Sequence, residues 1–144
     1  MKTLIFAFAL IALAGCGEPW NGIDGVYSGT TTETVTANNN TTTYTYTGSN
    51  VSIQSASQGG KVVVSTAQGA ITATLNGSAL VFDSSTMGSM DSSAGATNTT
   101  TTISSGSGTA TGTTLNFTLT GTITLSGGST GNGALSLAYT GTKL

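Results

Sequence analysis

The chain has 144 residues, of which three are basic and five acidic, and it contains no histidine or arginine. So few basic side chains cannot neutralise a row of phosphates, which argues against nucleic acid as a partner, and they cannot hold an anionic membrane surface by charge. Histidine is the commonest general base and the partner of most nucleophilic serines, so its absence argues against an enzyme.

The N-terminus carries a short apolar run at positions 4–13, behind the single basic residue Lys2. This arrangement is typical of a secretory signal peptide and is about half the length that a transmembrane helix needs. The run ends in Leu-Ala-Gly-Cys at positions 13–16, which resembles the bacterial lipobox. The resemblance implies that residues 1–15 are removed and that Cys16 carries acyl chains such as palmitate, which anchor the protein in a membrane. An ordinary signal peptide with an accidental cysteine is the alternative.

The residue that follows the cysteine is Gly17. In enterobacterial lipoproteins an Asp at that position retains the protein in the inner membrane, so by resemblance a glycine favours the outer membrane of a bacterial envelope. We therefore expect a lipidated leader over residues 16–24 and a single domain over residues 25–144. Cys16 is the only cysteine, so we expect no disulfide in that domain.

Threonine occupies 31 of the 144 positions, and low charge with Gly, Ser and Thr richness is typical of a disordered stalk. The order of the residues argues otherwise. Between Leu115 and Leu125 every second residue is apolar except Gly121, and Asn or Thr occupies the positions between. Because successive side chains of a strand point to opposite faces, this period of two predicts a half-buried strand.

In chain order, we expect strands over residues 25–36, 41–48, 50–57, 60–66, 69–76, 78–83, 97–104, 107–125 and 133–142. The range 107–125 is either one strand or two that break at Gly112 or Gly121. Asn76-Gly77 is the strongest hairpin signal, since a type I′ turn needs positive φ at both central residues. Residues 84–98 show no period, and we expect a long loop there.

Short connections between consecutive strands predict antiparallel neighbours in a meander. A sheet of eight or nine such strands has exposed edges unless it closes into a barrel. We therefore predict an all-β fold, a small up-and-down barrel of about eight or nine strands, with a β-sandwich as the alternative. An eight-stranded barrel is either filled by side chains or holds one small ligand.

Three short runs carry a family resemblance: Gly-Val-Tyr-Ser-Gly at 25–29, Gly-Thr-Thr-Leu-Asn-Phe at 112–117 and Tyr-Thr-Gly-Thr at 139–142. Together they resemble the small lipocalin-like lipoproteins of Gram-negative bacteria, in which G-x-Y or G-x-W begins the first strand. The resemblance implies a β-barrel over most of the mature chain. This chain lacks the arginine on the barrel floor and the T-D-Y loop of true lipocalins. The resemblance therefore supports a barrel more than it supports ligand transport.

The candidate ligand-binding residues are the four tyrosines, Tyr27, Tyr44, Tyr46 and Tyr139, whose rings could grip a sugar or an apolar ligand at a barrel mouth. The alternative is that Tyr27 and Tyr139 pack where the barrel closes, with each hydroxyl bonded at the rim. The five acids are scattered along the chain, and we interpret them as solubilising surface charges; they are Glu18, Asp24, Glu33, Asp83 and Asp91.

Metal binding has little support in the sequence. Asp83 and Asp91 lack the spacing of a calcium loop. Met87 and Met90 fit a hydrophobic contact beneath a loop better than a Cu(I) site. We expect no metal and no cofactor.

Three functions remain. We rank first a non-catalytic structural or interaction scaffold, anchored through Cys16, that contacts an envelope protein or a glycan. The second is binding of a small apolar or sugar ligand inside the barrel. The third is a Thr-rich surface adhesin, although the glycine spacing gives no fixed repeat of the kind that a solenoid needs.

Overall fold

The computed structural model describes residues 22–56, 59–87, 98–126 and 131–144. The expected signal peptide, the lipidation site Cys16 and the leader up to residue 21 lie outside these residues. So do Met90 and Asp91, which belong to the expected loop.

The elements of the described residues are β-strands. They are β1 (Gly25–Ala37), β2 (Asn40–Ser55), β3 (Lys61–Thr66), β4 (Gly69–Asn76), β5 (Ala79–Phe82), β6 (Ser85–Met87), β7 (Asn98–Ala110), β8 (Thr114–Ser126) and β9 (Gly131–Lys143).

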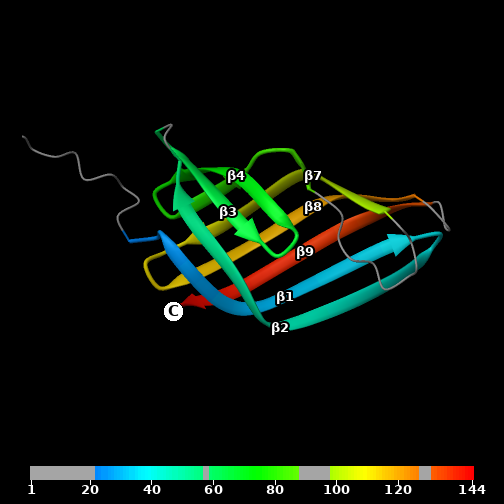
Figure 1. The fold of residues 1–144 in the computed structure, drawn as a ribbon, viewed down its shortest axis with the longest axis horizontal. Coiled ribbons are helices and arrows are strands. Elements are labelled where there is room, and N and C mark those ends of the chain that lie inside the picture. Colours follow the sequence, from blue (N-terminus) through cyan, green and yellow to red (C-terminus); the bar gives the residue numbers. More distant parts are fainter. Residues whose placement is uncertain (1–21, 57–58, 88–97, 127–130) are drawn as a thin grey trace, which may run out of the picture.

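The strands form one antiparallel sheet in the order β5-β4-β3-β2-β1-β9-β8-β7-β6. The sheet closes because β5 also pairs with β7, residues 79–82 lying against residues 106–109. Eight strands make the closed barrel, and the short β6 is an extra strand that pairs with β7 beyond the end of β5. Figure 1 shows how the strands curve around the barrel. The predicted all-β meander is confirmed. Because the sheet closes on itself, the fold is the predicted barrel and not the alternative sandwich.

The expected strands 41–48 and 50–57 are in fact one strand, β2. Gly48, with φ of 71°, is the extra residue of a β-bulge, because Gly29 pairs with Ser49 while its neighbour Thr30 pairs with Thr47. A bulge and a tight turn both use a glycine with positive φ, and therefore the same residues favoured a turn in the sequence.

The boundary between β7 and β8 falls in the turn around Gly112, so of the two expected break points Gly121 is wrong. Gly121 lies inside β8 and pairs with Ile103. The expected loop at 84–98 contains β6, whose three residues pair with β7. A strand of three residues is too short to show a period.

The hairpin between β4 and β5 is present, but its turn differs from the prediction. Asn76 still pairs with Ala79, so the two turn residues are Gly77 and Ser78. Of these, Gly77 has a positive φ of 61°. A positive φ at the first turn residue alone is the pattern of a type II′ turn, whose first position favours glycine.

The core is built from one parity of the strands, as predicted. Leu75, Leu80, Phe82, Phe117, Leu119 and Leu137 are all buried. The ring of Phe117 lies 5.2 Å, between centroids, from both Phe82 and Tyr139. Gly108 pairs with Phe117, and a Cβ at Gly108 would lie 2.6 Å from the Phe117 Cβ. The glycine therefore makes room for the ring.

β1 is bent along its length (Figure 1). Gly29 pairs with Gly141 next to the register shift between Gly29 and Thr30, and a Cβ at Gly29 would overlap the Thr140 carbonyl oxygen. Such close backbone approach is a common reason for glycine in a strand. We use this register shift to divide the molecule into two parts. We call β3–β5 and the strand segments next to them the closed half. The open half comprises residues 30–37, 40–47, 85–87, 98–103, 120–126 and 131–137. In the open half, the described partner of β2 is β1 alone.

Candidate functional site

Tyr27 and Tyr139, two of the four predicted ligand-binding tyrosines, lie in the core of the closed half. The Tyr27 hydroxyl donates to the Ile23 carbonyl oxygen at 2.7 Å and lies 2.9 Å from that of Thr111. The Tyr139 hydroxyl donates to the Tyr27 carbonyl oxygen at 2.9 Å. Burial raises the pKa of both phenols, and the charge of Asp24 adds to the effect at Tyr27. Both hydroxyl groups are thus bonded to the protein's own backbone.

Tyr44 and Tyr46 lie in the open half and are 38% and 46% exposed. Their rings stack, with centroids 6.5 Å apart and planes 20° apart. Across the β1–β2 ladder, Tyr44 pairs with Glu33 and Tyr46 with Thr31. Directly paired residues point to the same face of a sheet, and Glu33 and Thr31 are buried on the inner face. Both rings therefore lie on the inner side of the open half.

Glu33 is the site residue that the sequence interpretation missed. The expectation that it is a solubilising surface charge is wrong, because the residue is only 5% exposed. Its cross-strand neighbours are Tyr44 on β2 and Leu137 on β9. Among the described residues, its carboxyl group has no ion pair or hydrogen bond. Burial raises the pKa of the Glu33 carboxyl, because the charged form loses its hydration.

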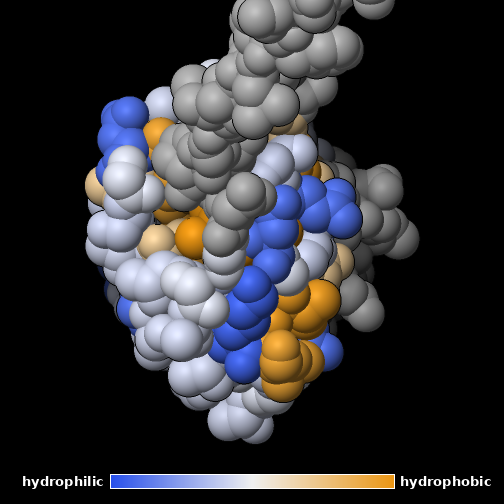
Figure 2. Space-filling model, turned by 90° about the vertical axis from the view of Figure 1, so that its left-hand side faces the viewer, coloured by the Kyte–Doolittle hydropathy of each residue, from blue (hydrophilic) through white to orange (hydrophobic). Residues whose placement is uncertain are grey.

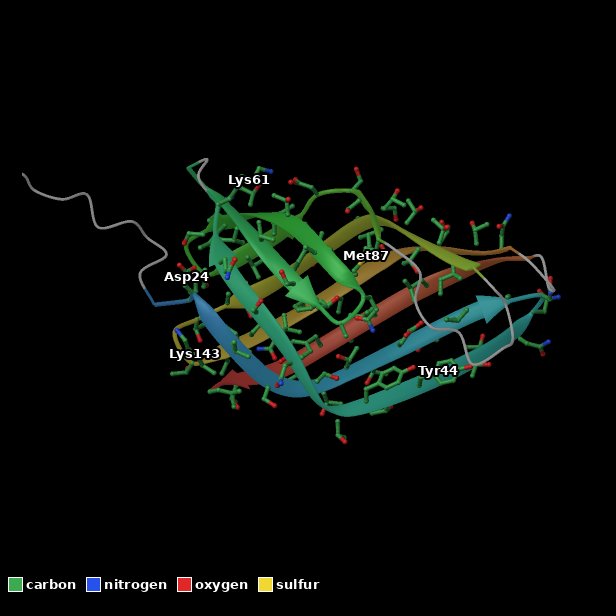
Figure 3. All side chains as sticks on the ribbon, in the orientation of Figure 1. Asp24, Tyr44, Lys61, Met87 and Lys143 are labelled. Carbon is green, nitrogen blue, oxygen red and sulfur yellow. The ribbon has the colours of Figure 1, made fainter. Side chains whose placement is uncertain are left out.

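Both lysines of the described chain are engaged away from Glu33. Lys61 Nζ lies 2.8 Å from Asp83 Oδ2. Lys143 Nζ donates to the Gly22 carbonyl oxygen at 2.7 Å. Lys143 pairs with Tyr27, six residues before Glu33 on β1, which is about 20 Å along a strand. Figure 3 shows Lys61 and Lys143 toward one end of the molecule and Tyr44 in the other part.

The open half also holds the other buried polar residues of the described chain, Thr31 and Thr101. The Thr101 hydroxyl, which is fully buried, finds no hydrogen-bond partner there. Thr101 pairs with Met87 on one side and Ile123 on the other. The interior thus changes character along the barrel. In the closed half it is apolar apart from the bonded tyrosine hydroxyl groups, whereas in the open half it is partly polar.

The described acids do not gather into a metal site: no group of three or more His, Cys, Asp or Glu residues lies together within the described ranges. Asp24 accepts a hydrogen bond from the Ser55 hydroxyl at 2.9 Å, and Asp83 pairs with Lys61. Met87 is buried in the core. Its predicted companion Met90 lies outside the described residues.

The outer surface of the barrel is rich in hydroxyl groups. On β8 the outward positions alternate with the buried ones and are Asn116, Thr118, Thr120, Thr122 and Thr124. A shallow depression of about 520 Å³ lies over β5, β7, β8 and β9. Its lining includes Val81, Thr109, Thr118, Ala138 and Thr140. The depression therefore exposes both methyl and hydroxyl groups.

The end of the barrel where β1 begins and β9 finishes has an apolar patch. Val26 and Leu144 are both exposed there, and the Leu144 amide donates to the Val26 carbonyl oxygen at 2.9 Å. Figure 2 views this end and shows hydrophobic atoms directly beside hydrophilic ones. The leader joins the domain at the same end, through Gly22.

No protein-family model and no curated protein matches this sequence. Among solved structures, the fold is similar to the crystal structure of a "putative outer membrane protein" from Bacteroides fragilis, with a TM-score of 0.50 and 18% sequence identity. The match covers 88% of this chain and 53% of the other, so this chain spans about half the length of that protein. What the two share is the fold.

Within the described residues, no helix is long and apolar enough to cross a membrane.

Proposed function

We propose that the chain is a non-catalytic domain of the bacterial cell envelope, anchored by acyl chains on Cys16, which contacts an envelope protein or a glycan through its outer surface. The observation that carries the proposal is the contrast between the two faces of the closed half. Its interior is filled by side chains such as Phe82, Phe117 and Tyr139. Its exterior presents Thr, Ser and Asn side chains, which can donate and accept hydrogen bonds.

The likeness in fold to a protein described as an outer membrane protein supports an envelope location. The exposed Val26 and Leu144 lie at the end where the leader joins, and we expect that end to face the membrane. A leader over residues 17–24 extends at most about 3.3–3.6 Å per residue, which would keep the domain within a few nanometres of its anchor.

The non-catalytic part of the proposal is supported by the separate environments of the described carboxyl groups. Asp24 is bonded to Ser55, Asp83 to Lys61, and Glu33 lies on the inner face of β1. Glycosidase chemistry would need two carboxyl groups flanking one bond.

We place the contact surface at the depression over β5, β7, β8 and β9. It combines apolar groups, Ala79 and Val81, with the hydroxyl groups of Thr118 and Thr140. Such a mixture suits a glycan or a polar protein surface, because hydrogen bonds fix the orientation while apolar contacts contribute burial.

Site-specific photocrosslinking in a Gram-negative host tests the proposal. A photoreactive amino acid replaces Thr118 in the depression or, as the matched control, the exposed Thr43 on β2. We expect a discrete crosslinked species from position 118 that is absent from position 43. In the Cys16→Ser variant we expect loss of metabolic labelling by an alkyne fatty acid and loss of the crosslink.

Equal crosslinking from both positions would contradict the contact surface. A Cys16→Ser protein that still takes up the fatty acid would contradict the anchor. Each result bears on a different part of the proposal.

A further inference from the structure

The open half contains a feature that the outer surface contact does not use, a mostly buried glutamate beside two accessible rings. Glu33 is 5% exposed, whereas Tyr44 and Tyr46 on the same face are 38% and 46% exposed. Burying a carboxylate without a partner is costly, because its hydration is lost. An opposite charge within about 4–6 Å offsets that cost.

The described part of the chain does not supply this charge. Lys61 is paired with Asp83 at 2.8 Å, and Lys143 bonds to the Gly22 carbonyl oxygen near the other end of β1. Across the sheet, Glu33 faces Leu137 on β9, an apolar residue. Among the residues that the structure describes, no basic side chain reaches Glu33, and a cationic ligand would supply the counter-charge.

We propose that Glu33, Tyr44 and Tyr46 bind an organic ammonium ion, with the Glu33 carboxylate as its counter-charge and the two ring faces as its aromatic contacts. The face of an aromatic ring attracts a cation within about 6 Å of its centroid. Tyr44 stands directly across from Glu33, and Tyr46 is the next residue of the same face. The negative charge of Glu33 reaches Tyr46, whose pKa is raised by partial burial and further by that charge.

The chemistry of the site favours a cation over a neutral sugar. Tyrosine rings stack on sugars as well, but a sugar has no positive charge to offset a buried carboxylate. An ammonium ion uses both the charge and the rings. This site and the outer contact surface are independent, so either can fail while the other stands.

The ammonium site has a predicted pH dependence. The groups that face Glu33 are Tyr44 and Tyr46 from β2, Leu137 from β9, and Thr31 and Val35 on its own strand. Of these, Glu33 alone titrates at acid to neutral pH, since phenols ionise near pH 10. Affinity for the cation should therefore rise with pH as Glu33 ionises, and then level off.

The test is titration of the purified full-length chain with choline, followed by NMR shifts of the Tyr44 and Tyr46 rings. The comparison ligands are the neutral alcohol in which a carbon replaces the choline nitrogen, and methyl glucoside. We expect choline to bind about tenfold or more tightly than the neutral alcohol, as for an interaction with a charged group. Glu33→Gln should remove that preference, and Tyr44→Leu should weaken binding of choline.

The control variants distinguish the contribution of the Tyr44 ring face from that of its hydroxyl group and from general effects on the fold. Tyr44→Phe should retain binding, because the ring face remains, and Thr43→Ala, at the neighbouring position that faces the opposite side, should leave it unchanged. The proposal is overturned if choline and the neutral alcohol bind equally, if methyl glucoside binds in preference to choline, or if affinity does not change with pH. The pH series uses the unsubstituted chain, so it decides the matter even if Glu33→Gln fails to fold.

Discussion

The long strands β1, β2, β7, β8 and β9 run through both the closed and the open half, yet the interiors of the two halves differ. In the closed half, the inward positions are apolar and the tyrosine hydroxyls are bonded to backbone carbonyl groups. In the open half, the same inward parity brings Thr31, Glu33 and Thr101 into buried positions. The first arrangement maximises apolar burial, whereas the second buries polar groups and so lowers the free energy of unfolding. We infer that the closed half contributes most of the folding stability. The open half keeps destabilising buried polar groups because they serve a function.

The largest expected effect is in the closed half. Phe117→Ala removes the ring that contacts both Phe82 and Tyr139, and we expect a loss of about 3–5 kcal/mol in the free energy of unfolding. Thr118→Ala, the outward neighbour, should cost about 0.5 kcal/mol or less. Urea denaturation of the two variants measures the difference, and equal losses would contradict the assignment of inward and outward faces.

Gly108→Ala should have the next largest effect. The added methyl group would meet the Asn116 carbonyl oxygen and the Phe117 Cα, which are backbone atoms that cannot turn away. We expect a loss of about 1–3 kcal/mol, as for other overpacked cores. Gly131→Ala is the matched control in the open half, where no atom lies within 4 Å of an added Cβ. Thermal unfolding should show a lowered Tm for the first variant alone.

Glu33→Gln should show a smaller effect that depends on pH. Burial raises the folded-state pKa of Glu33 above its ordinary value of 4.5, so between the two values the folded state binds more protons than the unfolded state. The free energy of unfolding therefore falls as pH rises through this interval, and the loss is complete above the folded-state pKa.

The Gln variant lacks this loss, so its stability relative to the unsubstituted chain should increase as pH rises. Urea denaturation at several values between about pH 4 and 8 measures the difference. A difference that stays constant across the series would show that Glu33 is not desolvated in the folded state.

Much of the closed half is predictable from the sequence because its strands are chemically two-sided. Ile71 and Ala73, or Phe117 and Leu119, identify their buried face by alternation alone. The barrel follows from the number of strands and their short connections. The sequence did not predict that Gly48 lies in a β-bulge, because a bulge and a turn both need a residue with positive φ.

The open half is harder to predict because both faces of its strands are polar. Around Glu33, β1 reads Thr-Thr-Glu-Thr-Val, so hydrophobicity does not distinguish the inner face. One signal was present: Glu33 has the same parity as Tyr27 and Val35, and a strand that keeps its period places all three on one side. Whether a described residue pairs with the carboxyl group depends on residues distant in sequence, and no local pattern predicts it.

Native-state hydrogen exchange tests the contrast between the halves most directly. The segments to compare are residues 31–35 of β1 and 115–119 of β8, each in a strand with neighbours on both sides. We predict that amides at 115–119 exchange only through global unfolding. Amides at 31–35 should exchange through a local opening of lower free energy. This is expected for a region that has buried polar groups and lies beside residues 40–47 of β2, whose described partner is β1 alone. Equal opening free energies in the two segments would contradict the division of the barrel into a stabilising half and a functional half.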